Sequence, residues 1–546
     1  MVKKRKSLRF GLMINSLNVE QWQHDTIRLL MDNGMKLSLI IQKADSTFPF
    51  SITKKNKNKS HGHFLYRLWN RFLFHPRSKF PVNIDKLTDG IPTIFCAPRV
   101  IRGISYFNEM DIQEIRNQNL DFILQLGFDI VAGEVINTTK YGVWKFNHGD
   151  SFWRYMRGKH SNSVILQKLS GKEEKEIYLK EIKLSTILHS YKAHLEQLHF
   201  DGSVLPLQVC KEILTTGELK SMTIDSKIKE SHLPNDFNMV SYYLKSVWRR
   251  IAFHLNDLFR QEDWNVGYCN CPIEDFVSAK ENEELEIHWF KKPRKNCYFA
   301  DPFIIKTEKD TYIFFEWYSY SKGKADLAVA RKSEDFKQYH ILTNFKEHRS
   351  YPYVFSHEGT IYCMPEANQT NQVCLYRFNE EKLTVEKDCV LLDGFPIVDA
   401  TLYHHENKWF MFLVNQKKSH SHLEIYHSDN LKGPYLPHHN NPVMIDCSKA
   451  RPAGKIFSCD GRIIRPSQNS TSHYGESLIL EEIEILSEKQ FSTIPFKIIE
   501  PIENSDYGKG IHTINGDDNI TVFDGDTKTG SATIKRDDVV FAAKTF

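Results

Sequence analysis

Carboxylates recur at matching places in the C-terminal half of the sequence. Asp301 and Asp399 each open a short apolar run, and a second apolar run begins eleven residues after each aspartate. Glutamates follow at Glu316, Glu366 and Glu476. If the aspartate runs are converging strands, carboxylates on separate strands can flank one glycosidic bond as its acid and base. The sequence therefore predicts Asp301, Asp399, Glu366 and Glu476 as candidate catalytic residues.

Cationic and amide side chains follow the same region. We predict that Arg451, Arg465, Gln468 and His512 bind substrate beside the carboxylates. Arginines favour an anionic ligand, such as a sugar phosphate or uronic acid, through paired hydrogen bonds. A structural alternative stays open: the aspartates cap inner-strand backbone groups, and Arg451, Arg465 and His512 only pair with them. No metal site is predicted.

The repeated pattern indicates which elements position these residues. Each copy consists of two alternating apolar strands joined by a short polar turn, and the copies start about 50 to 60 residues apart. Such a period with several strands per unit is typical of a β-propeller blade. The sequence therefore predicts a five-bladed β-propeller over residues 285–546, with the first strand of each blade lining a central funnel. The copies cover residues 301–315, 351–362, 399–413, 452–465 and 512–522.

The opening of the first copy, Ala300-Asp301-Pro302, and Asp399 in the third resemble the five-bladed propellers of glycoside hydrolase families 43 and 32. That resemblance implies one carboxylate as base or nucleophile, another that tunes it, and a glutamate as acid.

Several further motifs resemble a different family. They look like the N-terminal propeller of plant glucosamine inositolphosphorylceramide transferases, over residues 285–530. Related bacterial proteins carry this propeller after a formyltransferase-like domain. The plant proteins have a separate glycosyltransferase domain that is not expected within residues 1–546. The motifs are Tyr351–Val354, Met364–Glu366, Ser448–Gly454, Arg465–Gln468, Tyr474–Ser477 and Gly510–Thr513.

The N-terminal half alternates between predicted strands and helices, which indicates an α/β sheet with mostly parallel strands. Strands are expected at Arg9–Ile14, Leu37–Ile41, Thr93–Cys96 and Leu120–Gly127, with a helix over Val19–Asn33. Ligands of such sheets bind beyond the carboxyl ends of the strands. This rule places a candidate site at Gly127-Phe128 and residues 142–158.

Residues 9–190 resemble the Rossmann-like core of formyltransferases, through Asp121–Phe128, Tyr141–His148 and Arg157-Gly158. The family's Asn-x-His-x-Ser signature is disrupted, because Lys145 and Asn147 occupy its Asn and His positions. A one-residue slip supplies His148. Formyl transfer needs an amide and an imidazole for the oxyanion and a carboxylate for protons. The resemblance therefore implies a formyltransferase fold for which formyl-tetrahydrofolate is an unlikely cofactor; its actual cofactor is unknown.

Several side chains in this stretch are still expected to bind an anionic substrate. They are Lys145, Asn147, His148, Asp150 and Arg157. The alternative is acyl transfer by Lys145, His148, Asp150 and Glu173. Three domains are expected: a formyltransferase-like domain over 1–190, a helical connector over 191–284 and the propeller over 285–546. Glu283–Trp289 is expected to add a strand that closes the propeller.

Composition narrows the partners and the compartment. A net charge of +4 is too small to indicate a nucleic-acid partner. No apolar run approaches the roughly 20 residues that a transmembrane helix needs. Without a signal peptide, a cytosolic location and reduced cysteines are expected.

Three functions fit these observations. The first is a cytosolic transferase in surface-polysaccharide or glycolipid assembly that binds a carbohydrate, a sugar nucleotide or a lipid-linked sugar. The second is a glycoside hydrolase that uses the propeller carboxylates. The third is a non-catalytic glycan-binding or scaffolding protein.

Overall fold

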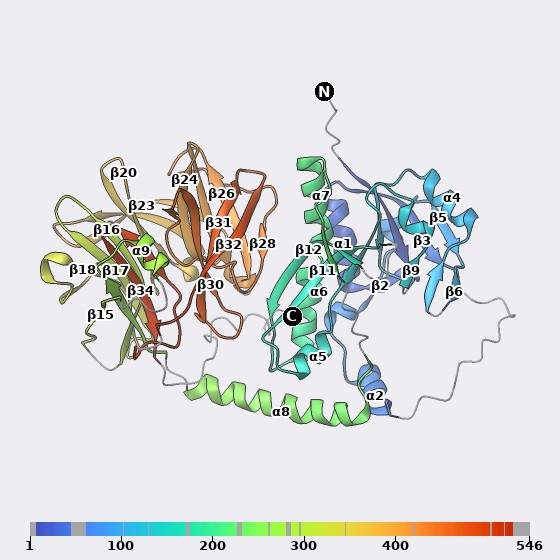
Figure 1. Cartoon of the computed structure of the whole chain (residues 1–546), viewed down its shortest axis with the longest axis horizontal. Coiled ribbons are helices and arrows are strands. Elements are labelled where there is room, and N and C mark those ends of the chain that lie inside the picture. The colour runs from blue at the N-terminus through green and yellow to red at the C-terminus, as the bar shows by residue number, and fades with distance from the viewer. Residues whose placement is uncertain are drawn as a thin grey trace. The chain divides into compact units, whose positions relative to one another are not determined.

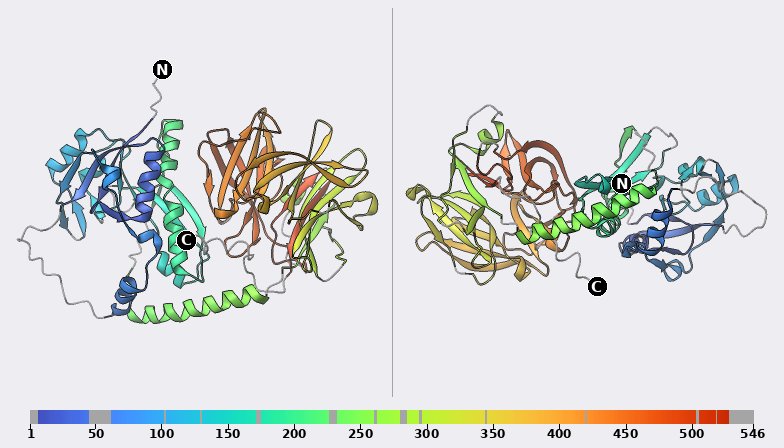
Figure 2. Two further views of the ribbon diagram at one scale, coloured as in Figure 1. Left: turned by 180° about the vertical axis from the view of Figure 1, so that it is seen from behind. Right: turned by 90° about the horizontal axis from the view of Figure 1, so that it is seen from below.

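The computed structural model divides into two compact units (Figure 1). The N-terminal unit comprises residues 1–182 and 186–252, and the C-terminal unit comprises residues 183–185 and 253–546. The structure describes residues 7–527, with the exception of 45–61, 102, 129, 171–174, 226–231, 260–261, 280–284, 294–295, 344, 419–420, 503–504 and 518. In the further views of Figure 2, helices and strands mix in the N-terminal unit, whereas strands dominate the C-terminal unit.

An eight-stranded mixed sheet forms the centre of the N-terminal unit, in the order β13-β12-β11-β10-β8-β1-β3-β5. Its first five strands along the chain pair in parallel, and β10 pairs antiparallel with β11. Five of the six β1 residues are buried, as a parallel sheet covered on both faces requires. The strands are β1 (Arg9–Ile14), β3 (Lys36–Lys43), β5 (Thr93–Cys96), β8 (Phe122–Gln125), β10 (Val143–Asn147), β11 (Ser161–Lys168), β12 (Lys175–Ser185) and β13 (Met222–Asp225).

Helices and two small sheets complete this unit. Helix α1 begins with a capping box, in which the Glu20 side chain and the Gln23 side chain each bind the other residue's backbone N–H. The helices are α1 (Gln21–Asp32), α2 (Phe64–Phe72), α3 (Asp85–Thr88), α4 (Glu109–Asn117), α5 (Ser151–Met156), α6 (Tyr191–Gly202), α7 (Leu205–Thr216) and α8 (Asp236–Phe259). The small sheets pair β2 (Asn18–Glu20) with β4 (Pro81–Asn83), and β7 (Ile104–Tyr106) with β6 (Arg99–Ile101) and β9 (Ile130–Ala132).

The structure differs from the predicted three-part division. Helices α6 and α7 contact α1 and β11, and β13 extends the central sheet, so these segments belong to the N-terminal unit. Strand β14 (Trp264–Cys269) belongs to the C-terminal unit instead. The helices of residues 191–216 carry apolar faces that need a partner surface, which a free connector does not offer. Helix α2 lies in a part of the chain for which the sequence predicts no helix.

Five antiparallel sheets make up the C-terminal unit. Four of them are formed by consecutive segments of the chain, as the repeats predict. Their strands are β16 (Cys297–Lys306), β17 (Thr311–Ser319), β18 (Lys324–Arg331) and β19 (Tyr339–Ile341); β20 (Ser350–His357), β21 (Thr360–Glu366), β22 (Gln372–Asn379) and β23 (Thr384–Asp393); β24 (Ile397–His405), β25 (Lys408–Asn415), β26 (His422–Ser428), β27 (Leu436–Pro437) and β28 (Met444–Ile445); and β29 (Phe457–Cys459), β30 (Arg462–Asn469), β31 (Ser477–Leu486) and β32 (Phe491–Ile499).

The fifth sheet joins distant parts of the chain. Strand β14 pairs with β34 (Ile520–Asp526), which pairs in turn with β33 (Ile514–Asp517). Strand β15 (Ile287–Trp289) adds to β14 on its other edge. Strand β15 thus lies inside Glu283–Trp289, the segment that was predicted to add a strand. Strand β14, which the repeats do not indicate, joins β15 to the C-terminal strand β34. The short helix α9 (Ile273–Ser278) contacts β33 and β34.

Three repeats share one backbone distortion. Asp301, Tyr351 and Asp399 have positive φ angles of 51°, 44° and 51°. A register shift occurs at each of these positions, between β16 and β17, β20 and β21, and β24 and β25. Non-glycine residues rarely adopt this conformation, and such strain persists only where the surrounding structure holds it. The repeat therefore places one strained residue, at a register shift, in the first strand of each of three sheets.

Two further features bear on the predictions. The structure joins Cys269 to Cys271 in a disulfide, whereas reduced thiols were expected throughout. The two Cα atoms lie 5.6 Å apart, within the range that a disulfide spans. Within the described residues, no helix combines the length and the apolar character that spanning a membrane requires.

Candidate functional site

Asp301 lies at the centre of a buried hydrogen-bond network. Its Oδ1 accepts a hydrogen bond from the Thr513 hydroxyl at 3.0 Å, and its Oδ2 accepts from the Tyr351 backbone N–H at 3.1 Å. The Asp301 backbone N–H donates to Asp524 Oδ2 at 3.0 Å. These contacts hold the strained backbone of Asp301 and join three of the five sheets.

His512 lies between two carboxylates of this network. Its Nε2 is 2.9 Å from Asp301 Oδ1, and its Nδ1 is 3.2 Å from Asp524 Oδ1. Burial lowers the pKa of His512, but the carboxylates of Asp524 and Asp301 outweigh burial and raise this pKa to about 10. His512 is therefore an imidazolium at neutral pH.

A second group surrounds Asp399. Arg451 Nε forms an ion pair with Asp399 Oδ2, and Gln468 Nε2 donates to the same oxygen at 3.4 Å. The Asp399 backbone N–H donates to Glu366 Oε2 at 3.3 Å. The Arg451 guanidinium also lies 5.0 Å from the centre of the Tyr474 ring. The structure thus brings together Asp399, Glu366, Arg451 and Gln468, as the sequence predicts.

Tyr351 connects the two groups. Its backbone binds Asp301, and its hydroxyl lies 2.9 Å from the Thr401 hydroxyl and accepts a hydrogen bond from the Gly454 N–H at 2.8 Å. A side chain at Gly454 would place its Cβ 2.0 Å from the Ile514 carbonyl oxygen, so only glycine fits. We call the connected set of Asp301, Tyr351, Glu366, Asp399, Arg451, Gln468, His512 and Asp524 the carboxylate network.

Glu366 is the member best suited to proton transfer. Burial, followed by the nearby Asp399 carboxylate, raises the pKa of Glu366 well above its usual value, although Arg451 opposes this effect. Glu366 is half-buried, whereas Asp301 and Asp399 are only 6% and 1% exposed. A protonated carboxyl group can donate a hydrogen bond to a sugar oxygen or protonate a leaving group.

Other predicted residues lie outside the carboxylate network. Arg465 forms an ion pair with Glu481 and donates to the backbone carbonyls of Lys449 and Ala450. The guanidinium of Arg465 is thus buried against a structural partner, and its predicted role in substrate binding stays a prediction. Glu476 accepts a hydrogen bond from the Ser472 N–H at 2.9 Å and holds a local loop.

The predicted absence of a metal site stays untested. Among the described residues, Asp301, His512 and Asp524 have ligand atoms within 4.8 Å of one another. Metal binding needs a neutral imidazole with a free lone pair. The raised pKa of His512 fits an imidazolium held between two carboxylates better than a metal ligand.

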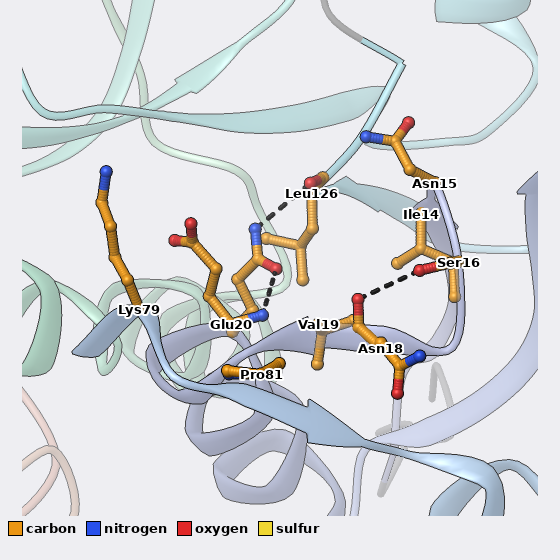
Figure 3. A pocket seen from close by; sticks show the side chains of 10 residues that line it. Ile14, Asn15, Ser16, Asn18, Val19, Glu20, Lys79, Pro81 and Leu126 are labelled. Carbon is orange, nitrogen blue, oxygen red and sulfur yellow. Dashed lines mark hydrogen bonds between the residues drawn. The ribbon is translucent and has the colours of Figure 1, made fainter. Parts of the chain in front are cut away.

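The N-terminal unit contains a polar cavity of about 290 Å³ at the carboxyl ends of β1 and β8 (Figure 3). Its lining includes Asn15, Ser16, Glu20, Lys79 and Leu126. Gln23, which also lines the cavity, donates through Nε2 to the Leu126 carbonyl at 3.2 Å. The strand order changes direction between β1 and β8: the strand after β1 in this sheet, β3, lies on one side of the pair, and the strand after β8, β10, lies on the other. Open α/β sheets bind ligands at such a switch point.

The predicted N-terminal residues do not line this cavity. Lys145 and Asn147 lie on β10, and the Asn147 side chain accepts a hydrogen bond from the Gly149 N–H at 2.8 Å. Asp150 is the N-cap residue of α5 and Arg157 its C-cap residue. Glu173 lies outside the described residues.

His148 lies among aromatic rings, which does not suit the predicted substrate contact. Its ring centre is 5.1 Å from that of Trp22 and 4.7 Å from that of His199. Burial, followed by the charge of Lys79, lowers the pKa of His148 to about 4. His148 is therefore neutral at physiological pH.

Sequence reasoning missed the turn after β1 and its contact with β8. The signal was present in the polar run Asn15-Ser16, which directly follows a buried strand. Gly127 permits the close approach, because a Cβ at this position would lie 2.7 Å from the Asn15 backbone nitrogen. Asn15 Oδ1 in turn accepts a hydrogen bond from the Phe128 N–H at 2.9 Å.

In the C-terminal unit, sequence reasoning missed Asp524, because nothing in the local sequence distinguishes it from other aspartates on strands.

Comparisons with solved structures give weak likenesses to part of the chain. A thermostable family-43 glycoside hydrolase is similar with a TM-score of 0.30 and 11% identity, over 37% of this chain and 77% of that chain. An exo-beta-1,3-galactanase from Phanerochaete chrysosporium, solved with galactose, gives a TM-score of 0.30 and 14% identity, over 37% of this chain and 51% of that chain.

Sequence comparisons are more specific. The protein named Glucosamine inositolphosphorylceramide transferase 1 from Oryza sativa subsp. japonica is 30% identical over 210 residues, and its counterpart from Arabidopsis thaliana is 31% identical over 212 residues. In both cases the match covers 37% of this chain but only 28% of the relative. Residues 288–526 match the family model described as Glucosamine inositolphosphorylceramide transferase 1, N-terminal.

Proposed function

We propose that this chain acts in glycosyl transfer during glycolipid or surface-polysaccharide assembly, and that its C-terminal unit is a five-bladed propeller that binds the glycan. One observation carries the proposal: the family match over residues 288–526 contains the whole carboxylate network, from Asp301 to Asp524. The relatives are named for a transferase that acts on inositolphosphorylceramide, so a glycosylated lipid is the proposed substrate class.

Glu366 is the proposed proton-transfer group. Its carboxyl is half-buried and retains a proton above the pH at which an ordinary glutamate ionises. Asp399 binds Glu366 through its backbone and Arg451 through its side chain, so it positions the group without needing to react. Asp301 is a positioning residue in this proposal, because contacts from Thr513, Tyr351 and His512 occupy both of its oxygens.

The N-terminal unit is the proposed donor-binding part, with a formyltransferase-like fold that does not transfer formyl groups. The polar cavity beside β1 and β8 contains the ammonium of Lys79 and the amides of Asn15 and Asn18, which suit the phosphates of a sugar nucleotide or lipid-linked sugar. The misplaced signature residues, Lys145 and Asn147, support a reaction other than folate-dependent formyl transfer. Titration calorimetry with formyl-tetrahydrofolate tests this part, and micromolar binding with transfer of the formyl group to the amine of an amino sugar would contradict it.

The transferase proposal is tested with the full chain, nucleotide sugars and vesicles that contain inositolphosphorylceramide. Mass spectrometry of the lipids should show an added sugar, and Glu366→Gln should lower the rate by about 100-fold or more. Glu386→Gln, an exposed carboxylate on strand β23, is the matched control and should keep the rate of the wild type. No turnover of any donor by a folded protein would contradict the proposal.

Glycoside hydrolysis is the second candidate. The raised pKa of Glu366, next to Asp399, favours it, because glycosidases pair an acid of raised pKa with a second carboxylate. The occupied oxygens of Asp301 speak against Asp301 as the base. Release of reducing sugar from glycolipids without a donor, abolished by Glu366→Gln, would favour hydrolysis. Glycan binding that survives Glu366→Gln without any product would instead support a non-catalytic binding protein.

A further inference from the structure

Helices α2 and α8 expose an unusual number of large apolar side chains. Phe237, Leu244 and Trp248 of α8 are 80%, 69% and 69% exposed, and Phe64 of α2 is 66% exposed. We call this group the α2–α8 surface. It consists of Phe64, Leu68, Phe72, Leu73, Phe237, Val240, Leu244, Val247, Trp248 and Ile251.

The exposed residues of α8 share one face of the helix. They follow one another at intervals of three or four residues, from Phe237 through Leu244 to Ile251, with Trp248 beside Val247. The other face packs against the N-terminal unit through Met239 and Tyr242, which are buried. The helix is therefore held on one side and leaves an apolar stripe on the other.

Helix α2 is fixed to the start of α8 (Figure 1). The Leu65 N–H donates to Asp236 Oδ1 at 2.8 Å, and the Asp236 N–H donates to the Gly62 carbonyl at 2.7 Å. The buried ring of Trp69 lies 5.3 Å from the ring of Tyr242. These contacts hold α2 against the first half of α8, so the exposed apolar side chains of the two helices lie in neighbouring elements.

The charge along these helices is predominantly positive. Residues 62–84 and 237–256 contain no aspartate or glutamate, and the acidic residues of α8 are confined to Asp236 and Asp257 near its ends. Arg67, Arg71 and Arg250 are exposed beside the apolar side chains. An aqueous surface seldom combines a large apolar patch with a predominance of cations, whereas a helix that lies on an anionic membrane does.

We propose that the α2–α8 surface docks the protein on an anionic lipid bilayer, with the apolar side chains in the boundary between headgroups and acyl chains. Trp248 and Tyr243 suit this boundary, since amphipathic rings concentrate there. Lys245, Arg249 and Arg250 lie within α8, so the helix lies on the surface rather than crossing it. Docking needs neither the carboxylate network nor a bound substrate.

Sedimentation with vesicles tests the docking. The full chain is mixed with vesicles of phosphatidylcholine alone or with added phosphatidylserine, without any sugar donor. We expect binding to the anionic vesicles, and a loss of about tenfold or more in the double variant Leu244→Glu/Trp248→Glu. Met110→Glu is the matched control, because Met110 of α4 is even more exposed, at 83%, but belongs to another helix than the α2–α8 surface.

A second variant tests the charges. Arg67→Glu/Arg71→Glu should remove most of the preference for phosphatidylserine and the salt dependence of binding. The proposal is overturned if the wild type does not bind either vesicle, or if the double variant of α8 binds as tightly as the wild type. It is also overturned if the α8 variant only converts a dimer into a monomer, since a second copy would then cover the surface. Glycosyl transfer to a soluble acceptor is unaffected by either variant, which separates failed docking from a failed function.

Discussion

Each unit buries histidine among aromatic rings, yet the two environments hold opposite charge states. In the N-terminal unit, His199 lies 5.2 Å from the ring of Trp22 and 4.7 Å from that of His148. Burial, followed by His148 and Lys79, lowers the pKa of His199 to about 2. In the C-terminal unit, His512 lies 4.2 Å from the ring of Trp264, but the carboxylates of Asp524 and Asp301 raise its pKa to about 10.

This difference shows what the carboxylate network requires. Burial by aromatic rings disfavours the imidazolium in both units, and only a pair of carboxylates reverses that effect. The dependence is mutual, because Asp301 and Asp524 are themselves 6% and 1% exposed and need a cation nearby. His512 therefore stabilises the buried charges that hold Asp301 in its strained conformation, whereas the N-terminal histidines act as apolar packing residues.

Removal of the His512 imidazole should have the largest effect on stability. His512→Leu leaves two buried carboxylates without their cation, so we expect a loss of about 3–5 kcal/mol in the free energy of unfolding. His199→Leu should cost only about 1–2 kcal/mol, since it removes a neutral ring with one hydrogen bond to Ser78. Urea unfolding monitored by circular dichroism measures both. Equal losses in the two variants would contradict the proposed difference between the units.

The pH dependence of unfolding should differ in sign between the units. The raised pKa of His512 means that its stabilisation is complete below about pH 6.5 and is lost as the pH rises towards 10, by up to about 5 kcal/mol. The lowered pKa of His148 has the opposite effect: stability falls as the pH drops from about 6.5 towards 4. Urea titrations across this range should show both losses, and His512→Gln should remove only the alkaline one. An unchanged alkaline slope in that variant would refute the assignment.

In the C-terminal unit, the sequence predicts the individual strands better than it predicts the pairing of β14 with β34, which joins the two ends of the unit. Alternating apolar residues and short turns define strands such as β16 and β17 locally, and these pair as neighbours. Strand β14 pairs with β34 across more than half of the C-terminal unit, and no local pattern specifies such a partner. The repeat also aligned Asp301, Tyr351 and Asp399, but the positive φ angles that distinguish them follow from tertiary contacts.

Residue type alone could not assign the charged side chains. Arg451 and Arg465 are equally basic and occur 14 residues apart, yet Arg451 binds Asp399 and Arg465 binds Glu481. Which carboxylate each arginine meets depends on the register between β30 and β31, where Arg465 faces Glu481. In the N-terminal unit, the alternation of strands and helices predicted the edge of the sheet at which the cavity lies, but not the turn that lines it.

A smaller change should separate the role of Glu366 in chemistry from its role in folding. Because the pKa of Glu366 is raised, the folded protein loses stability as the pH rises above the usual value for glutamate. Glu366→Gln removes the ionisable group and keeps an oxygen for the Asp399 N–H, so we expect about 1 kcal/mol greater stability at pH 8, together with lost activity. Thermal unfolding at pH 5 and pH 8 measures the difference. A variant that gains no stability at pH 8 relative to pH 5 would show that Glu366 is ionised in the folded protein.

The smallest effect is expected at His148, where the two histidine environments can be compared directly. Among the described residues, its buried Nε2 has no hydrogen-bond partner, and its ring stacks against Phe146 at 5.8 Å. Phenylalanine at this position keeps the ring contacts and removes a buried polar atom, so His148→Phe should change the free energy of unfolding by less than about 1 kcal/mol, with stabilisation as the favoured sign. It should also weaken the acid-side loss of stability, because one lowered histidine pKa disappears. His512→Phe is the matched substitution in the other unit and should be severely destabilising. A large loss in His148→Phe would mean that His148 has a polar role after all, and the N-terminal unit would then use its buried imidazole as the C-terminal unit does.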